Sequence, residues 1–236
     1  MKTLIGMSGG VDSAVTAALV SKNQDAAGIT LRLYDGNNPD LIQKFDREAS
    51  DAADVCKKLG IGHTTLDLKS DFYQFVIKHF IDEYIAGRTP NPCIQCNIHI
   101  KFGAMLDYAK ANGFDSIATG HYARVDKLPN GRYAIRNSVT AAKDQTYALY
   151  NLTQYQLAHT LMPVGAYPKD EIRKMAEAAG LDENTCAIEI GPGVGVLTAE
   201  LAKRAGKVLS FELDRRLLPV LKETLEDFNN VEIINV

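Results

Sequence analysis

The sequence lacks tryptophan, contains only four cysteines among 236 residues, and has no long apolar run. A helix that crosses a membrane needs about 20 mainly apolar residues, so no membrane partner is predicted. The N-terminus also lacks the apolar segment of a signal peptide, and we therefore expect a cytoplasmic protein. The cysteines, at positions 56, 93, 96 and 186, are too few and too scattered for a secreted disulfide framework.

A basic excess is absent as well. The 26 Lys and Arg residues are outnumbered by 29 Asp and Glu residues, which gives a formal net charge of −3. Nucleic-acid-binding domains usually show a basic surface, so the overall charge gives no indication of this function. It does not exclude the function either, because a local stripe of basic side chains suffices to contact phosphates. The length predicts one large domain or two small ones.

Strands and helices alternate along most of the chain. Strands are expected at residues 2–7, 26–33, 63–68 and 115–119. Helices are expected at about 12–21, 47–59, 71–86 and 94–111, with a hairpin at 122–136 and two or three helices between 144 and 180. This order predicts an α/β fold with a doubly wound parallel sheet, in which ligands bind at the carboxyl ends of the strands.

A second βαβαβ pattern begins near residue 186. Its strands are expected at 186–190, 207–213 and 231–236, and its helices at 196–205 and 214–227. No Pro- or Ser-rich linker separates the two parts. We therefore expect one domain over residues 1–181 and an incomplete second domain over residues 182–236.

The segment Ser8-Gly9-Gly10-Val11-Asp12-Ser13 lies between the first predicted strand and the first predicted helix. Its glycines allow a positive φ and a close approach to a ligand, and the start of the helix forms an anion site. The loop is not a Walker A motif because it lacks the GKS/T ending. Asp12 suits a phosphate site when Mg²⁺ bridges it. Alternatively, Asp12 or Ser13 caps a simple turn, although capping needs neither Ser8 nor both glycines.

A proline-rich loop at residues 89–97 contains Cys93 and Cys96. The following helix is expected to lower the pKa of the Cys96 thiol in its first turn and so to favour a nucleophilic thiolate. A zinc site would need a second ligand pair at a suitable spacing, which the sequence does not offer, so no metal site is predicted. A buried structural pair stays open but fits such a loop poorly. Cys56 is interpreted as a core residue.

Several motifs occur in one order: SGGVDS, RTPNPCIQCN, IKFG, ATGHYAR, KDQTYALY, LTQYQLAHTLMPVG and KxEIRKMAEAAGL. With these motifs the chain resembles the tRNA-specific 2-thiouridylases over residues 1 to about 181. The resemblance implies an adenine nucleotide alpha-hydrolase-like PP-loop domain that uses ATP and Mg²⁺. The implied ATP-binding residues are Gly6, Met7, Ser8, Gly9, Gly10, Val11, Asp12, Ser13, Leu31 and Gly120.

The same resemblance implies a reaction. The enzymes of this family adenylate the C2 oxygen of the wobble uridine, and a persulfide sulfur delivered by a sulfur-relay protein replaces the activated oxygen. Cys96 matches the catalytic nucleophile that releases this sulfur and forms a disulfide. The implied tRNA-binding residues are Asn91, Pro92, Cys93, His121, Lys143, Asp144 and Gln145. Taken singly, His121 could be a satisfied polar loop residue, and KDQ the charged start of a helix.

From about Leu181 onward the chain resembles the start of the rRNA adenine dimethyltransferases, a partial Rossmann-like methyltransferase unit. The residues that carry this resemblance are AIEIGPGVGVLT at 187–198 and SFELD at 210–214. It implies that Gly191, Gly193 and Gly195 approach S-adenosylmethionine and that Glu212 binds its ribose hydroxyls. A generic βαβ turn is the alternative.

The context of Cys186, a strand that enters a glycine loop, differs from that of the family's persulfide cysteine. We therefore do not assign the persulfide role to Cys186, and we expect complete thiolation and methyl transfer to fail in this chain alone. Three functions stay open: a truncated tRNA-uridine 2-sulfurtransferase, an rRNA adenine dimethyltransferase fragment, and a non-catalytic remnant that binds nucleotide and tRNA. The change of resemblance near residues 178–181 is interpreted as the join of a chimeric gene.

Overall fold

The computed structural model describes residues 1–34, 39–178, 186–190, 196–203, 207–212 and 214–235. The chain forms two compact units, residues 1–173 and 174–236. None of the helices among these residues has the length and apolar content to span a membrane.

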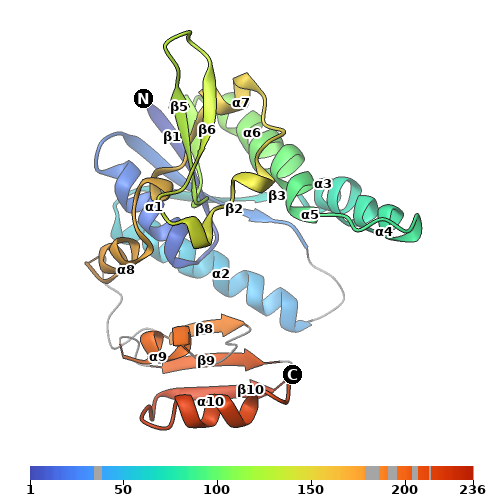
Figure 1. Cartoon of the computed structure of the whole chain (residues 1–236). Coiled ribbons are helices and arrows are strands. Elements are labelled where there is room, and N and C mark those ends of the chain that lie inside the picture. Colours follow the sequence, from blue (N-terminus) through green and yellow to red (C-terminus); the bar gives the residue numbers. More distant parts are fainter. Residues whose placement is uncertain (35–38, 179–185, 191–195, 204–206, 213, 236) are drawn as a thin grey trace. The chain divides into compact units, whose positions relative to one another are not determined.

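A five-stranded parallel sheet forms the centre of the first unit, with the strand order β3-β2-β1-β4-β7 (Figure 1). Its strands are β1 (Lys2–Met7), β2 (Asp25–Arg32), β3 (Gly62–Asp67), β4 (Ser116–Ala118) and β7 (Thr160–Leu161). From the central strand β1 the chain builds the sheet first to one side, through β2 and β3, and then to the other. This arrangement confirms the predicted doubly wound sheet.

Side chains alternate along each strand, so β1 contributes residues to both faces of the sheet. Different helices cover the two faces. On β1, Ile5 and Met7 pack against α1 (Val11–Ser21) and α2 (Pro39–Lys58). Cys56 of α2 is fully buried in the same cluster, which confirms its interpretation as a core residue. The helix α2 ends before Gly60, whose φ of 70° suits the predicted stop.

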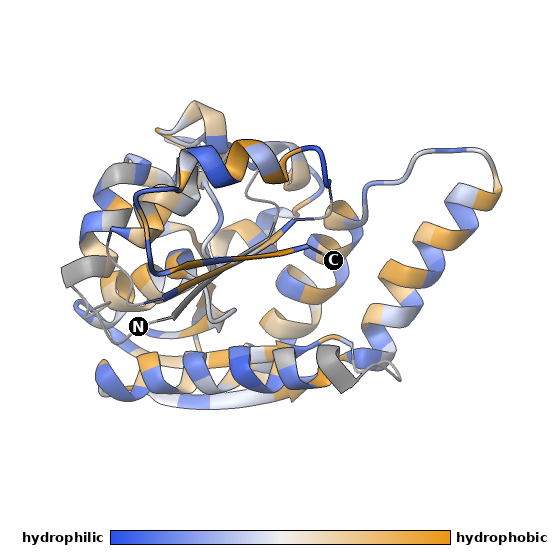
Figure 2. Cartoon of the chain, turned by 90° about the horizontal axis from the view of Figure 1, so that it is seen from below, coloured by the Kyte–Doolittle hydropathy of each residue, from blue (hydrophilic) through white to orange (hydrophobic). Residues whose placement is uncertain are grey.

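Leu4 of β1 points to the opposite face and packs with residues from five elements outside the main sheet. These elements are the π-helix η2 (Cys96–Ala104), α6 (Met105–Ala111), α7 (Gln154–Ala158) and the hairpin of β5 (Ala123–Lys127) and β6 (Tyr133–Asn137). Hydrophilic and hydrophobic segments alternate along the helices in Figure 2, as expected when each buries one face.

Two helices that the sequence predicts as continuous contain π-helical segments instead. The first comprises α3 (Lys69–Phe72), η1 (Tyr73–Ile77) and α4 (Lys78–Ile85), and the second α5 (Pro92–Gln95), η2 and α6. The second interruption contains Gly103, where a Cβ would lie 2.8 Å from the carbonyl oxygen of Ile98, five residues earlier, so only glycine fits this geometry without a shift. The two π segments also contact each other, since the rings of Phe75 and His99 stack with centroids 4.4 Å apart.

Two further elements differ from expectation. The helix α2 begins at Pro39, eight residues before the predicted start at Arg47. The strand β7 lies where only helices are expected, and it joins the sheet through the pairing of Thr160 with Ile117 and of Leu161 with Ala118. A strand of two residues is too short to show the alternation by which strands are predicted.

The second unit contains a three-stranded parallel sheet in the order β10-β9-β8. Its elements are β8 (Cys186–Ile190), α9 (Val196–Ala202), β9 (Lys207–Glu212), α10 (Leu218–Thr224) and β10 (Val231–Asn235). Val208 of β9 and Leu221 of α10 are fully buried. This sequence of elements confirms the predicted βαβαβ unit.

Gly165, in the short 3₁₀ turn η5 (Pro163–Ala166), provides a test of the packing. A Cβ at this position would lie 1.9 Å from the carbonyl oxygen of Ala123, so the backbones must separate to accept it. We expect Gly165→Ala to lower the free energy of unfolding by about 1–3 kcal/mol. Urea unfolding followed by far-ultraviolet circular dichroism measures this in a chain without tryptophan.

Gly62→Ala is the matched control for this substitution. No atom lies within 4 Å of a Cβ at Gly62, so its unfolding midpoint should stay close to that of the wild type. Equal midpoints for the two variants would contradict the close approach of Gly165 to Ala123.

Candidate functional site

The carboxyl ends of β1 and β4 lie side by side, and two of the sequence motifs follow them. The two strands are parallel neighbours in which Ile5 pairs with Ala118. The glycine loop follows β1, and the segment from Thr119 to Tyr122 follows β4. The strand order reverses between these two strands, which is the place where α/β sheets bind ligands.

Hydrogen bonds within the glycine loop fix its shape. The Ser13 hydroxyl oxygen accepts from the backbone N–H and from the hydroxyl of Ser8, at 3.2 Å in each case, and it donates to the carbonyl oxygen of Gly10 at 2.8 Å. Gly9 has a φ of 74°. The N-cap of α1 is Gly10 and no side chain caps it, so the alternative that Asp12 or Ser13 serves as the cap is not supported.

Ser8, Gly9 and Gly10 are exposed, whereas Ser13 is buried. The first N–H groups of a helix have no intrahelical partner, and at the start of α1 they follow an exposed loop. Such a helix start attracts anions through its N–H groups and its dipole. The loop therefore has the geometry of a phosphate site.

Gly120 holds the segment after β4 against the first turn of α1. A Cβ at this position would lie 3.1 Å from the carbonyl carbon of Asp12 and 3.2 Å from the backbone nitrogen of Ser13. A larger residue would therefore push the start of α1 away from β4. Sequence analysis expects Gly120 near adenosine, and the structure places it directly behind the loop.

The Asp12 carboxylate joins three segments of the chain. Its Oδ1 accepts from the Tyr122 hydroxyl at 2.6 Å and from the Lys169 Nζ at 2.7 Å. Lys169 is the first residue of α8 (Lys169–Ala178), and its Nζ also donates to the Tyr122 hydroxyl oxygen at 2.8 Å. Sequence reasoning singled out neither Tyr122 nor Lys169. Their presence in the motifs ATGHYAR and KxEIRKMAEAAGL was the only available signal.

Two of the three KDQ residues form hydrogen bonds with neighbouring segments of the chain, and the third is exposed to solvent. The side chain and the backbone N–H of Gln145 pair with the backbone of Tyr122, at 2.9 and 3.0 Å. The Asp144 carboxylate accepts from the backbone N–H of Ser138 at 2.7 Å and from the N–H and hydroxyl of Thr146. Burial opposes the charge of Asp144, but these hydrogen bonds lower its pKa overall. Lys143 is exposed.

His121 is buried between the sheet and the cysteine-bearing helix, with 7% of its surface exposed. Its Nδ1 lies 2.9 Å from the Thr119 hydroxyl, and its ring centroid is 5.5 Å from that of Phe102. Burial, aided by the positive charge of Lys101, lowers the pKa of His121 to about 3. The ring is therefore neutral near pH 7 and supplies no positive charge for tRNA phosphates.

The helix that carries the cysteines begins at Pro92, with Asn91 as its N-cap. The Asn91 Oδ1 accepts from the backbone N–H of Cys93 at 3.0 Å. Cys93 is exposed and Cys96 is partly buried, and both thiols are free. The predicted loop-to-helix transition is thus present, one turn ahead of Cys96.

The pKa of the Cys96 thiol is raised, mainly by burial, although Lys101 acts to lower it and Cys93 raises it further. This direction is the opposite of the predicted one. The physical reason is that Cys96 follows the four residues of α5 and packs against Leu68 and Val76, so it lies beyond the helix start and among apolar groups. In this state Cys96 is a protonated thiol near pH 7.

Asn97 connects the cysteine-bearing helix to the loop of KDQ. Its Nδ2 donates to the carbonyl oxygen of Ala148 at 3.0 Å, and the residue is 2% exposed. Within the described parts of the chain, the Asn97 Oδ1 is the only buried side-chain oxygen or nitrogen without a hydrogen-bond partner. Through Ala148, Gln145 and Tyr122, the cysteine-bearing helix is connected to Asp12.

The remaining predicted nucleotide residues lie at or near the same edge of the sheet. Gly6 and Met7 end β1, and the Met7 side chain is buried in the core, so it can offer a ligand only its backbone. Leu31 lies near the carboxyl end of β2, which runs beside β1. No three His, Cys, Asp or Glu side chains in the described ranges come together to hold a metal ion.

In the second unit, Glu212 ends β9, next to the carboxyl end of β8. Its side chain is buried, and its Oε1 accepts from the backbone N–H of Asp214 at 2.8 Å. Gly191, Gly193 and Gly195, which are predicted to approach S-adenosylmethionine, lie outside the described residues.

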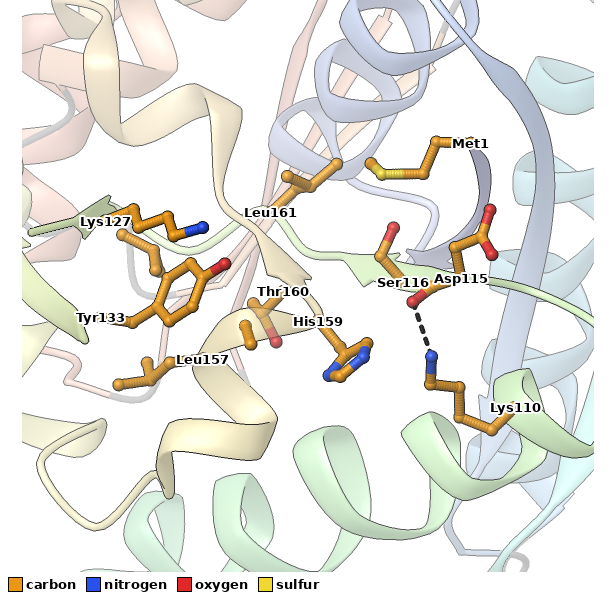
Figure 3. A pocket seen from close by; sticks show the side chains of 12 residues that line it. Met1, Lys110, Asp115, Ser116, Lys127, Tyr133, Leu157, His159, Thr160 and Leu161 are labelled. Carbon is orange, nitrogen blue, oxygen red and sulfur yellow. Dashed lines mark hydrogen bonds between the residues drawn. The ribbon is translucent and has the colours of Figure 1, made fainter. Parts of the chain in front are cut away.

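A cavity of about 510 Å³ lies at the opposite edge of the main sheet (Figure 3). Met1, Ser116 and Thr160 line it beside the amino-terminal ends of β1, β4 and β7, and the Lys110 Nζ donates to the carbonyl oxygen of Asp115 in its wall at 3.0 Å. None of the predicted site residues lines this cavity. It is therefore separate from the edge that carries the glycine loop.

A parallel, doubly wound sheet whose central strand runs into an SGGVDS loop defines an α/β nucleotide-binding domain of the PP-loop class. Residues 1–187 match the family described as tRNA methyl transferase HUP domain, and the chain belongs to this family. Residues 169–236 match the family described as ribosomal RNA adenine dimethylase. Both resemblances inferred from the motifs are thereby confirmed.

Two named enzymes agree with the assignment to the first family. The tRNA-specific 2-thiouridylase MnmA of Lachnoclostridium phytofermentans is 47% identical over 186 residues, which are 76% of this chain and 52% of that protein. The enzyme of the same name from Clostridioides difficile is 48% identical over 185 residues, 76% of this chain and 51% of that protein. The chain thus spans about half the length of these relatives. A crystal structure of the 23S rRNA methyltransferase ErmE is 41% identical, covers 30% of this chain and 29% of its own, and has a TM-score of 0.26.

The burial of His121 predicts a pH dependence of stability. In the unfolded chain His121 binds a proton below about pH 6.5, whereas in the folded chain it does so only near pH 3. Stability should therefore fall as the pH decreases through this window, by at most about 1.4 kcal/mol per pH unit from this group. His121→Gln cannot titrate and should show a shallower fall.

Urea unfolding between about pH 4 and pH 7 measures this difference. His159→Gln, at a less buried position, is the matched control for the loss of a histidine ring. Parallel profiles for the wild type and His121→Gln would show that His121 is not held neutral in the folded protein.

Proposed function

We propose that residues 1–173 bind ATP at the glycine loop and adenylate the C2 oxygen of the wobble uridine of tRNA, the activating step of 2-thiolation. The observation that carries this proposal is the exposed glycine loop at the switch point, which Gly120 and the Tyr122 hydroxyl hold from the neighbouring strand β4. The names of the relatives, tRNA-specific 2-thiouridylases, support uridine as the acceptor.

In the proposed step the C2 oxygen of the uridine attacks the α-phosphorus of ATP. The bond between this phosphorus and the oxygen that bridges to the β-phosphate breaks, and pyrophosphate leaves. Oxygen on C2 is a poor leaving group, and its attachment to AMP makes it a good one. The N–H groups at the start of α1 would hold the phosphates and stabilise the charge that develops on the leaving group.

Asp12 is the carboxylate of the glycine loop that could bind Mg²⁺ together with the phosphates of ATP. Mg²⁺ is commonly held by one or two carboxylates and by substrate phosphates, so a single carboxylate at this position suits it. Bound there, Mg²⁺ would neutralise part of the phosphate charge.

For the sulfur step we propose Cys96 as the nucleophile. Its thiolate would attack the inner sulfur of a persulfide on a second cysteine, so that a disulfide forms and the outer sulfur leaves as hydrosulfide. Attack of that sulfur on C2 of the uridine would then expel AMP. The persulfide would come from a sulfur-relay protein, and we do not assign the second cysteine to Cys186. Because the Cys96 thiol is free, a reducing compartment such as the cytoplasm suits this chemistry.

The structure separates the proposed tRNA residues into two groups. We propose that Asn91, Pro92 and Cys93, at the exposed start of the cysteine-bearing helix, meet the target base, and that the exposed Lys143 contacts a phosphate. Asp144, Gln145 and His121 would act by shaping this surface, because their side chains are engaged with neighbouring residues of the chain: Ser138, Thr146, Tyr122 and Thr119.

Pyrophosphate release tests the activating step. We expect the whole chain to release pyrophosphate from ATP when a tRNA with U at the wobble position is added, because adenylation needs the acceptor. Cys96→Ser should retain this release, since the thiol acts only in the sulfur step. The double variant Ser8→Ala/Asp12→Asn should lose it, because both substitutions alter the loop.

A tRNA of the same sequence with C at the wobble position is the substrate control. If the wild type releases no more pyrophosphate than the double variant, adenylation by this chain is disproved. Binding of ATP without release would instead favour the non-catalytic remnant. Release with the C-containing tRNA at the same rate would exclude the wobble uridine as the acceptor.

As a second function we propose that the second unit binds S-adenosylmethionine. The match of residues 169–236 to the ribosomal RNA adenine dimethylase family favours this proposal, and so does the position of Glu212 at the carboxyl end of the middle strand. A carboxylate there can accept hydrogen bonds from ribose hydroxyls. When bound, S-adenosylmethionine would supply a methyl group, and we propose no transfer step for this chain alone.

Titration calorimetry with S-adenosylmethionine checks this second function. We expect binding by the whole chain and about tenfold weaker binding by Glu212→Gln, since a hydrogen bond to a charged acceptor contributes about 1.5–3 kcal/mol. Glu232→Gln, at an exposed position of β10, is the control and should bind as the wild type does. Absence of binding at millimolar ligand would remove this function.

A further inference from the structure

The glycine loop contains no positive charge that could balance the charge of bound phosphates. Residues 8–13 contain one acidic residue, Asp12, and no basic residue. ATP carries several negative charges, and a carboxylate next to them repels them. A Walker A loop solves this problem with a lysine of its own that reaches the phosphates. The loop described here must obtain a positive charge from elsewhere.

Lys169 supplies a positive charge at this position. It is 157 residues away from Asp12 in the sequence, yet its Nζ lies 2.7 Å from the Asp12 Oδ1 and 2.8 Å from the Tyr122 hydroxyl oxygen. Its Nζ is also 5.0 Å from the centroid of the Tyr122 ring, within the range of a cation–π contact. The Lys169 side chain is 24% exposed and that of Asp12 is 35% exposed, so water and ligands can reach the pair.

The partners of Lys169 are themselves fixed. Asp12 lies in the first turn of α1, against which Gly120 packs. The backbone of Tyr122 is paired with Gln145. The backbone N–H of Lys169 donates to the Thr140 hydroxyl at 3.1 Å, which attaches the start of α8 to the same unit. The ammonium group is therefore held at the helix start where phosphates would bind.

We propose that Lys169 is the phosphate-binding cation of the glycine loop, and that Asp12 and Tyr122 are its positioning residues. This inference rests on the proposed ATP-dependent function and assigns to Lys169 the contact with the β- and γ-phosphates, the part of ATP that leaves as pyrophosphate. A lysine binds phosphate as a compact point charge, as the lysine of the Walker A loop does. The alternative is that Lys169 only attaches α8 to α1.

The two roles differ in how nucleotide affinity depends on the number of phosphates. If Lys169 binds phosphate, Lys169→Met in the whole chain should weaken ATP and inorganic pyrophosphate about 10- to 100-fold, the size of a charge-assisted contact. The same variant should bind adenosine, which has no phosphate, within about twofold of the wild type. Titration calorimetry with the three ligands gives these ratios, and thermal unfolding shows whether the variant is folded.

Two further variants complete the design. Lys174→Met, which removes an exposed lysine of the same helix, is the matched control and should bind all three ligands as the wild type does. Lys169→Arg keeps the charge and should recover most of the lost ATP affinity. Equal weakening of adenosine and ATP by Lys169→Met, or unchanged ATP binding, would overturn the phosphate role.

The test also separates this inference from the function on which it rests. A wild-type chain that binds no ATP overturns both. A wild type that binds ATP and releases pyrophosphate with tRNA, together with a Lys169→Met variant that does the same equally well, overturns only the role of Lys169.

Discussion

The parallel pairing of β1 with β2 on one side and with β4 on the other is the constraint on which the site depends. Residues after β1 and residues after β4 are more than 100 positions apart in the sequence, and this pairing brings them to one edge. Backbone hydrogen bonds of a central strand fix the register, and a slip by one residue would turn every side chain to the other face. Leu4 and Ile5 make such a slip costly, because each is buried in a different core cluster.

From this edge, the site is assembled through close backbone contacts and few side chains. Gly120 allows the segment after β4 to touch α1, and Gly165 allows η5 to touch Ala123. Each close approach positions a polar group: the Tyr122 hydroxyl reaches Asp12, and the Gly165 carbonyl accepts from the backbone N–H of Val139. Substitutions at these glycines would therefore disturb the site through the backbone, even though glycine has no side chain to bind a ligand.

The cysteine-bearing helix is connected to the glycine loop through Asn97, whose side-chain oxygen lacks a hydrogen-bond partner. A buried oxygen without a hydrogen-bond partner, such as the Asn97 Oδ1, destabilises a protein by about 1–3 kcal/mol. Asn97 lies in the π-helical segment η2, and π-helical segments are rare and are often found at functional sites. The residue next to it in the chain is Cys96. The unpartnered oxygen therefore lies beside the thiol that is proposed as the nucleophile, in an irregular segment of the helix.

The sequence predicts the sheet and the motif positions well because both depend on local signals. Apolar runs mark β1 to β4 within one or two residues, and Gly60 marks the end of α2. Prediction from the sequence fails where contacts between distant parts of the chain determine the local structure or the pKa of a group. The two residues of β7 become a strand only because β4 offers an edge. The pKa of Cys96 rises because Leu68 and Val76 pack around it, which no feature of the CxxC pair reveals.

An acidic residue in each of the two units lies at a proposed ligand site, and the surroundings of the two carboxylates differ. Asp12 and Glu212 each lie at the carboxyl edge of a parallel sheet, and their motifs predict different ligands for them. Their partners differ: the Asp12 carboxylate accepts from an ammonium group and a phenol, whereas that of Glu212 accepts from a backbone amide. An acidic residue paired with a lysine leaves its surroundings able to accept an anion, which suits phosphates. A buried carboxylate held by a neutral amide suits hydroxyl donors such as those of a ribose. The folded environment of each carboxylate therefore agrees with the ligand that is proposed for its motif.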